Sequence, residues 1–82
     1  MPFHIKWLHF EKRAEYSTGG KILHVLTLTR GKQVVICSKA HAEIESPIVQ
    51  WQSCILPTGF GDYEVVNHSE GLCEVVILRW KQ

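Results

Sequence analysis

Residues 50–65, QWQSCILPTGFGDYEV, decide the fold because they set a sharp corner between two short apolar segments. Pro57 fixes φ and has no backbone N–H, so it ends the first segment. Gly59 tolerates the positive φ that a tight corner needs. Residues 52–56 and 62–68, on either side of the corner, carry the apolar and β-branched side chains that are typical of strands. The stretch therefore predicts two strands joined by a tight corner.

Strand patterns continue outward from this corner in both directions. Residues 22–29 and 33–38 are separated by the turn signal Arg30-Gly31-Lys32, so we expect them to pair as a hairpin. In all, the sequence predicts about seven strands, over residues 3–10, 22–29, 33–38, 41–46, 52–56, 62–68 and 72–80. Their spacing of roughly 8–12 residues indicates an all-β protein, an antiparallel sandwich or small barrel.

Two segments interrupt this pattern. Residues 11–16 are expected to form a helical turn, which Ser17-Thr18-Gly19-Gly20 closes. Pro47 is expected to end the half-exposed strand of residues 41–46, because proline cannot donate to a ladder of backbone hydrogen bonds. The sequence has no internal repeats, low-complexity stretches or linkers, so we expect one domain over residues 1–82.

The composition of the 82 residues is that of a folded domain, since 45% are apolar and 21% are charged. Nine Lys and Arg side chains stand against eight Asp and Glu, a formal net charge of +1. That balance argues against nucleic acid as a partner, because nucleic-acid binders normally carry a strongly basic face. It also leaves little charge repulsion between copies, which favours self-association.

The apolar runs and the cysteines bear on location. No run approaches the roughly 20 apolar residues that span a bilayer, and the first residues lack the apolar core of a signal peptide. Cys37, Cys54 and Cys73 are odd in number, have no CxxC spacing and lie in apolar segments, where a thiol behaves as a small hydrophobe. We therefore expect no membrane contact and a reducing, cytoplasmic location.

Ser53, Pro57 and Gly59 also fall on positions of a known pattern. The stretch resembles the second conserved motif of cupins, G(x)5PxG(x)2H(x)3N, in the form used by the small C-terminal domain of class I mannose-6-phosphate isomerases. The first cupin motif, G(x)5HxH(x)3–4E(x)6G, can be laid over the preceding hairpin with its final glycine on Gly31. The resemblance implies a cupin-type jelly roll, and because small cupins commonly pair through their sheets it also implies a homodimer.

The metal ligands of cupins do not carry over. Two His and a Glu of the first motif and one His of the second bind the metal in metal-containing cupins. Position by position, those ligands fall on Thr18 and Gly20 (or Ser17 and Gly19), on His24 and on Asp62. Transition metals usually need at least three protein ligands in fixed geometry, so we expect no metal and no other cofactor.

The resemblance also argues against the isomerase reaction. In class I mannose-6-phosphate isomerases the catalytic zinc belongs to the N-terminal part of a much longer chain, whereas this sequence resembles only the C-terminal accessory domain. We expect no catalytic residues. The main hypothesis is a stand-alone, non-metal binding or accessory domain for a sugar or sugar phosphate. Two alternatives stay open: a small isomerase-like carbohydrate enzyme acting at the barrel mouth, and a purely partner-binding structural domain.

His24 and Asp62 are the first candidates for binding a ligand. By alternation His24 shares a face with Leu26 and Leu28, and the cupin overlay points that face inward. One interpretation is a core histidine with a single hydrogen-bond partner. The other is a pair of His24 with Asp62 across the mouth of the barrel, which binds a small polar ligand or acts as an acid–base couple, since a nearby carboxylate favours the charged imidazole.

Trp51 and Arg30 complete the set of expected ligand-binding residues. Trp51 precedes a short strand and is expected at a surface edge, where its ring suits sugar stacking or a dimer contact. Arg30 belongs to a group of basic residues that could meet a sugar phosphate at one end of the molecule, the alternative being a solvated surface.

Overall fold

The computed structural model describes residues 3–80, and the ends of the expected domain, residues 1–2 and 81–82, lie outside the described residues. The elements in chain order are β1 (Phe3–Phe10), β2 (Arg13–Ser17), β3 (Leu23–Arg30), β4 (Gln33–Ser38), β5 (Glu45–Val49), β6 (Ser53–Leu56), the 3₁₀ helix η1 (Thr58–Phe60), β7 (Asp62–Asn67) and β8 (Cys73–Trp80). Within the described part, no helix is long and apolar enough to cross a membrane.

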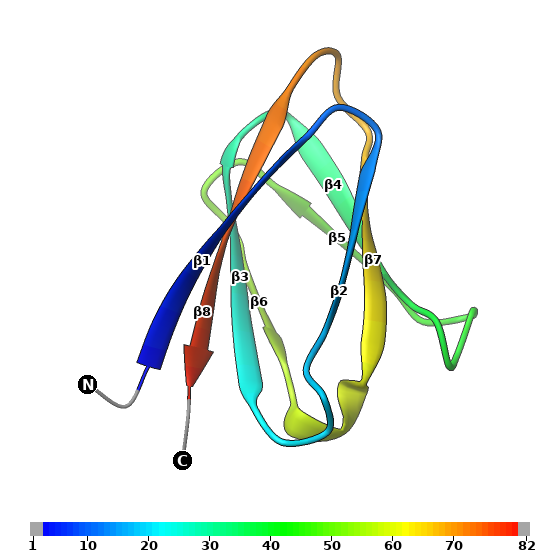
Figure 1. The fold of residues 1–82 in the computed structure, drawn as a ribbon. Helices are drawn as coiled ribbons and strands as arrows, with labels where there is room; N and C mark the ends of the chain where they lie inside the picture. The colour runs from blue at the N-terminus through cyan, green and yellow to red at the C-terminus, as the bar shows by residue number, and fades with distance from the viewer. Residues whose placement is uncertain (1–2, 81–82) are drawn as a thin grey trace.

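The strands form two four-stranded antiparallel sheets that face each other (Figure 1). Sheet A has the order β1-β8-β3-β6, and sheet B has the order β2-β7-β4-β5. Strands far apart in sequence are neighbours in both sheets: β8 lies between β1 and β3, and β7 lies between β2 and β4. The expected all-β jelly-roll sandwich is confirmed, with eight described strands where the sequence predicted about seven.

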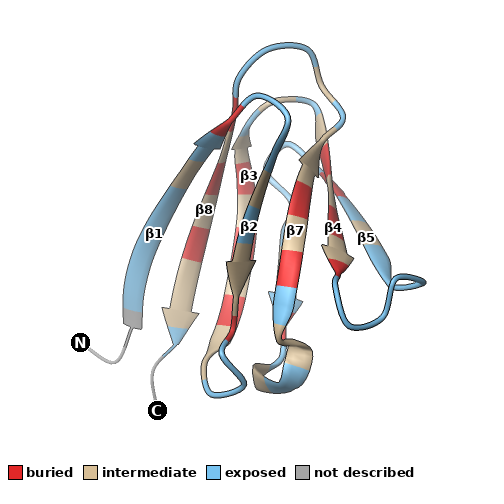
Figure 2. Ribbon diagram, turned by 45° about the vertical axis from the view of Figure 1, so that its right-hand side comes forward, coloured by how far each residue is buried: buried red, intermediate tan, exposed pale blue. Residues whose placement is uncertain are grey.

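The core lies between the sheets and is built by alternation along the central strands. Leu26 and Leu28 of β3 are fully buried, while the residues between and beside them are only partly so. Buried residues alternate with less buried ones along β4, β7 and β8 in the same way, as Figure 2 shows. Because successive side chains of a strand point to opposite faces, each strand gives one face to the core. The buried apolar residues are Phe10, Leu26, Leu28, Val34, Ile36, Ile48, Leu56, Tyr63, Val65, Cys73, Val75 and Ile77.

The helical turn predicted for residues 11–16 is wrong. This segment contains β2, which pairs antiparallel with β7 so that Tyr16 lies opposite Tyr63. Ala14 and Tyr16 are partly buried and pack against the core, whereas Arg13 and Glu15, which alternate with them, are exposed. Pairing with a strand almost fifty residues away decides the conformation of this segment, and local helix propensity does not.

The predicted hairpin of residues 22–29 and 33–38 is also wrong, although both strands exist. β3 belongs to sheet A and β4 to sheet B, so the chain crosses between sheets at the turn around Gly31. Gly31 has a φ of 117°, and a Cβ there would lie 2.9 Å from Cβ of Cys73. Both the backbone angle and the close approach of β8 require glycine at this position.

Two further corrections concern prolines and glycines at strand ends. β5 begins later than predicted and contains Pro47, which lies opposite Val35 of β4. Since β5 is the edge strand of sheet B, proline costs no hydrogen bond to a further strand there. At the corner after β6, Gly61 has the positive φ of 77°, whereas Gly59 lies inside η1.

Candidate functional site

The structure separates His24 from Asp62. His24 points into the sandwich and is 1% exposed. Asp62 is the exposed first residue of β7 and directly precedes Tyr63, which is fully buried, so the Asp62 side chain lies on the outer face of sheet B. The expected pair of His24 with Asp62 is therefore not formed. Nδ1 of His24 lies 2.9 Å from the hydroxyl of Tyr63 instead.

Arg30 and Trp51 lie at the opposite end of the molecule from His24. Arg30 ends β3 and is six residues beyond His24, a separation of about 20 Å along an extended strand. Trp51 follows β5 in the turn to β6, is 70% exposed, and donates its backbone N–H to the carbonyl of Leu28 at 2.7 Å. The four residues expected to bind one ligand do not form one site.

The polar side chains that do converge are Tyr16, His24, Tyr63 and Arg79, which we call the mouth cluster. Nη1 of Arg79 donates to the hydroxyl of Tyr16 at 2.9 Å. The rings of Tyr16 and His24 stack, with centroids 5.4 Å apart and an interplanar angle of 29°. Tyr63 meets both rings edge to face. The strands β2, β3, β7 and β8 each supply one member of the cluster, so both sheets contribute.

Strand register explains why these residues meet. Cys73, Val75 and Ile77 of β8 are buried, so the next inward position is Arg79, near the end of the strand where the sandwich opens to solvent. Arg79 lies directly opposite His24 in the β3–β8 ladder. Tyr16 and Tyr63 are opposite one another in the β2–β7 ladder. Two inward-facing cross-strand pairs, one from each sheet, thus lie at the same end.

The mouth cluster carries one uncompensated positive charge. Burial, with a smaller contribution from Arg79, lowers the pKa of His24 below its ordinary 6.5, so the imidazole is neutral at pH 7. Burial, followed by the neighbouring Tyr16, raises the pKa of Tyr63, which keeps that phenol neutral too. Among residues 3–80, no carboxylate forms an ion pair with Arg79, and its buried Nε has no hydrogen-bond partner.

The loop between β2 and β3 and the helix η1 close this end of the sandwich, as Figure 1 shows. Thr18 is the buried link between them. Its Oγ1 donates to the carbonyl of Thr58 at 2.8 Å and accepts from the backbone N–H groups of Gly61 and Gly20, at 2.9 and 3.3 Å. The described residues enclose no pocket. Tyr16 and Arg79 are the partly exposed members of the cluster, so the cluster is nearest to solvent on their side.

The residues at the cupin ligand positions do not fit a metal. The Thr18 hydroxyl is already hydrogen-bonded to backbone groups, Gly20 has no side chain, and Asp62 faces outward. Of the four positions only His24 faces the interior with a ligating group. Across the described part of the chain, no three His, Cys, Asp or Glu residues are grouped so that they could hold a metal ion.

Three members of the mouth cluster were missed from the sequence. The signal for Arg79 was present, because it continues the period of two set by Val75 and Ile77 in the last strand. Tyr16 was not recognised as an inward-facing residue because its segment was expected to be helical. Tyr63 was recognised only as a strand residue, since nothing local distinguishes a core tyrosine from one that bonds a histidine.

No family model matches the chain, and no curated protein sequence matches it. Several solved structures are similar in fold. A Cupin 2 conserved barrel domain protein from Salinispora arenicola has a TM-score of 0.75 and 17% identity, over 99% of this chain and 65% of its own. A cupin-superfamily sugar phosphate isomerase from Silicibacter pomeroyi has a TM-score of 0.71 and 16% identity, over 100% of this chain and 52% of its own.

The cupin domain of Cnp3 from Schizosaccharomyces pombe is similar as well, with a TM-score of 0.75 and 11% identity over 99% of this chain and 54% of its own. The chain thus spans between 52% and 65% of the length of these three structures. Likeness at such low identity bears on the fold alone, and the narrower resemblance to the C-terminal domain of class I mannose-6-phosphate isomerase stays a prediction. The protein has the fold of the cupin superfamily.

Proposed function

We propose that this chain is a metal-free cupin-fold binding module that takes a small anionic ligand, of the sugar phosphate class, at the mouth cluster. The observation that carries the proposal is the unpartnered Nε of Arg79. A polar group that is buried without a partner costs about 1–3 kcal/mol, and more when it is charged. A ligand that supplies the missing acceptor removes this cost.

Arg79 suits a phosphate in particular. A guanidinium presents its N–H groups as a planar fork that matches two oxygens of a phosphate or carboxylate. Nη1 already donates to Tyr16, which orients the group, while Nε has no partner in the described structure. The hydroxyl of Tyr16 accepts from Arg79 and keeps its own proton free to donate. Phosphate oxygens that bind Nε would therefore find a second donor beside it.

Binding is better supported than catalysis. His24 is almost completely buried and bonds Tyr63, so it does not reach a ligand held at the rim by Arg79. Isomerisation of a sugar needs a positioned acid and base within hydrogen-bond reach of the substrate. The sugar phosphate isomerase with the same fold supports the class of ligand. It does not bring a catalytic pair to this chain.

A reducing compartment such as the cytoplasm is part of the proposal. Cys37, Cys54 and Cys73 are all free thiols. Burial raises the pKa of Cys73 to about 11, which keeps it protonated and unreactive, and burial also raises the pKa of the other two. Structural thiols of this kind are typical of proteins that live where thiols stay reduced.

Thermal-shift and calorimetric titrations test the proposal. Inorganic phosphate and a hexose 6-phosphate are expected to raise the Tm of the wild type by mass action, and the matching neutral hexose is not. Arg79→Met is expected to abolish the phosphate effect. Its own stability without ligand is expected to stay close to that of the wild type, because the substitution removes the unpartnered Nε together with the hydrogen bond to Tyr16.

Two matched variants sharpen the result. Arg79→Lys keeps the charge and loses the fork, so it is expected to bind phosphate about tenfold more weakly. Arg13→Met removes an exposed arginine that pairs with Glu64 on the outside of sheet B, and is expected to leave binding unchanged. Equal Tm shifts in the wild type and Arg79→Met, or no shift with either anion, contradict the proposal.

A further inference from the structure

We infer that Lys6 and His4 of β1 form a second anion-binding subsite beside Arg79, so that the whole site takes a diphosphate, a ligand with two neighbouring anionic groups. The inference rests on the proposed function, because Arg79 of the mouth cluster holds the first of the two groups. It brings in β1, a strand that supplies no member of the mouth cluster.

The inner face of β1 changes from apolar to polar along the strand. Phe10 is buried and Leu8 packs against the core, whereas Lys6 and His4 are exposed. These four residues alternate along β1, so they lie on the face that points toward sheet B. Figures 1 and 2 show why their exposure differs, since β1 and β2 diverge from the turn that joins them. Sheet B therefore covers one end of β1 and leaves the other end open.

Strand register places the two polar residues beside Arg79. His4 lies directly opposite Arg79 in the β1–β8 ladder, and Lys6 lies opposite Ile77. Cβ atoms of opposite residues are about 4.5–5.5 Å apart, and those of diagonal neighbours on the same face about 7–8 Å or less. Lys6 is such a diagonal neighbour of Arg79. Its long flexible stem lets the ammonium group reach a ligand that is bound at Arg79.

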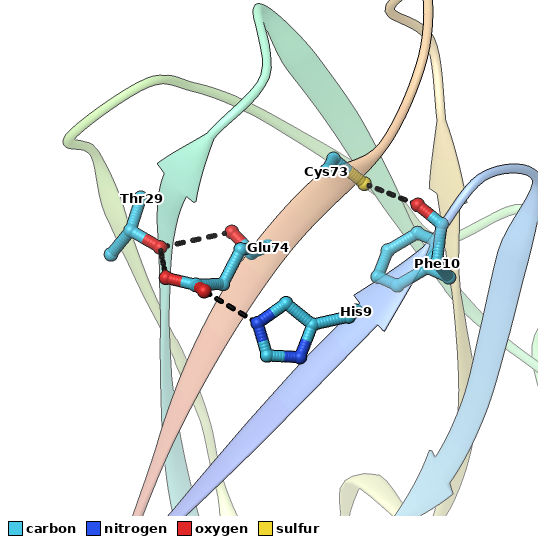
Figure 3. Close-up of polar contacts among 5 residues, drawn as sticks. All are labelled: His9, Phe10, Thr29, Cys73 and Glu74. Atoms are coloured by element: carbon cyan, nitrogen blue, oxygen red, sulfur yellow. Dashed lines mark hydrogen bonds and ion pairs between the residues drawn. The ribbon is translucent and has the colours of Figure 1, made fainter.

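Sheet A offers these donors no carboxylate. Among residues 3–80, neither Lys6 nor His4 forms an ion pair. Glu74 is the one acidic residue in β1 and β8, and it lies on the outer face of the sheet, between His9 and Thr29 (Figure 3). Its Oε2 lies 2.6 Å from Nε2 of His9, and its Oε1 accepts from Thr29 Oγ1 at 2.7 Å. The histidine on the outer face of β1 is thus paired, and the one on the inner face is not.

Sheet B brings no carboxylate to the opening either. Glu15 is the acidic residue of β2, and it alternates with Tyr16, which packs toward the core, so its side chain points outward. There it pairs with Lys39 at 2.8 Å. The positive charges of Lys6 and Arg79 therefore lie close together without an anion between them. Two like charges repel each other, and an anion that bridges them removes this repulsion.

A diphosphate matches this arrangement of donors better than a single phosphate does. Arg79 and Tyr16 offer the first phosphate a guanidinium fork and a hydroxyl. Lys6 offers the second phosphate a compact ammonium charge with three donors, and His4 adds a ring N–H. Because Lys6 and His4 are exposed, the second phosphate lies at the open side of the sandwich. A substituent on that phosphate extends into solvent.

Isothermal titration calorimetry with inorganic phosphate and with pyrophosphate, at constant ionic strength and without divalent metal ions, tests the inference. The wild type is expected to bind pyrophosphate about tenfold more tightly than phosphate, because the second group adds charge-assisted hydrogen bonds. Lys6→Gln removes the charge and keeps a polar side chain. It is expected to lower the affinity for pyrophosphate to about that for phosphate, and to leave phosphate binding unchanged. Lys6→Arg keeps the charge and is expected to keep the preference.

Lys32→Gln is the matched control. Lys32 is exposed in the turn after β3, at the opposite end of the molecule from His24, so this variant loses the same charge away from the site. It is expected to bind pyrophosphate as the wild type does. Both lysines are exposed, so neither substitution disturbs the core.

The outcomes separate this inference from the proposed function. A wild type that binds the two anions equally overturns the inference and leaves the site at Arg79 standing, whereas a wild type that binds neither overturns both. Equal losses in Lys6→Gln and Lys32→Gln also overturn the inference, because they show a response to net charge alone. Unchanged pyrophosphate binding in Lys6→Gln overturns it as well, and leaves Lys6 the role of an inward charge that keeps other strands from pairing with the edge strand β1.

Discussion

His24 is a buried imidazole in surroundings that oppose its protonation. Burial and the nearby Arg79 lower its pKa in the folded state below the ordinary 6.5. The unfolded chain therefore takes up this proton at a higher pH than the folded chain does. Stability is fully present above about pH 6.5 and falls as the pH drops from there toward the folded-state pKa. Urea denaturation at a series of pH values measures the decline.

His24→Gln isolates this effect. Glutamine keeps a group that can bond Tyr63 and cannot titrate, so the variant is expected to lose part of the decline in unfolding free energy below about pH 6.5. Glu74 affects the stability of the folded state in a different range of pH. Its hydrogen bonds to Thr29 and His9 lower the pKa of the carboxyl from its ordinary 4.5, so its contribution is lost only in more acidic solution. An unchanged pH profile in His24→Gln contradicts the account of His24.

At the scale of elements, Thr18 joins the loop after β2 to η1. Thr18→Val keeps the shape of the side chain and removes the hydroxyl, which leaves the carbonyl of Thr58 and the N–H of Gly61 without this partner. The expected loss of unfolding free energy is about 2–3 kcal/mol, because the unmet groups are partly buried. Thr18→Ser keeps the hydroxyl and is the control. Chemical denaturation of both variants makes the comparison, and equal stabilities exclude the hydroxyl as the link.

The positions of the strands along the sequence were easier to predict than the strands with which each one pairs. Six of the expected strand segments correspond closely to β1, β3, β4, β6, β7 and β8. Alternation of side chains is local, so it can be seen in the sequence. The predicted hairpin of β3 and β4 was wrong because two strands that follow each other in sequence can either pair or lie in opposite sheets. The local sequence pattern of strand, turn and strand is the same in both cases. The strand β2 was not predicted because its strand conformation depends on pairing with β7.

At the scale of the whole molecule, the homodimer that the cupin resemblance implies stays a prediction, and thermal stability tests it. Association of folded chains stabilises the folded state more at higher protein concentration, whereas the unfolded state gains nothing. The Tm of the wild type is therefore expected to rise with protein concentration in differential scanning calorimetry. If the chains pair through sheet A, the Tm of Ile55→Glu, which places a carboxylate at an exposed position of β6 in that sheet, is expected to stay constant over the same range. A wild-type Tm that does not depend on concentration contradicts the homodimer.

The sequence by itself determined the all-β class, the corner after Leu56 and the face that His24 shares with Leu26 and Leu28, since these depend on alternation and on the backbone limits of Pro57. The tertiary structure alone decided which side chains share the mouth. Tyr16 and Arg79 are 63 positions apart in sequence and touch only because β2 and β8 end at the same side of the sandwich. A shift of one residue in either ladder turns every side chain to the opposite face, so register, which only the folded pairing sets, decides the site.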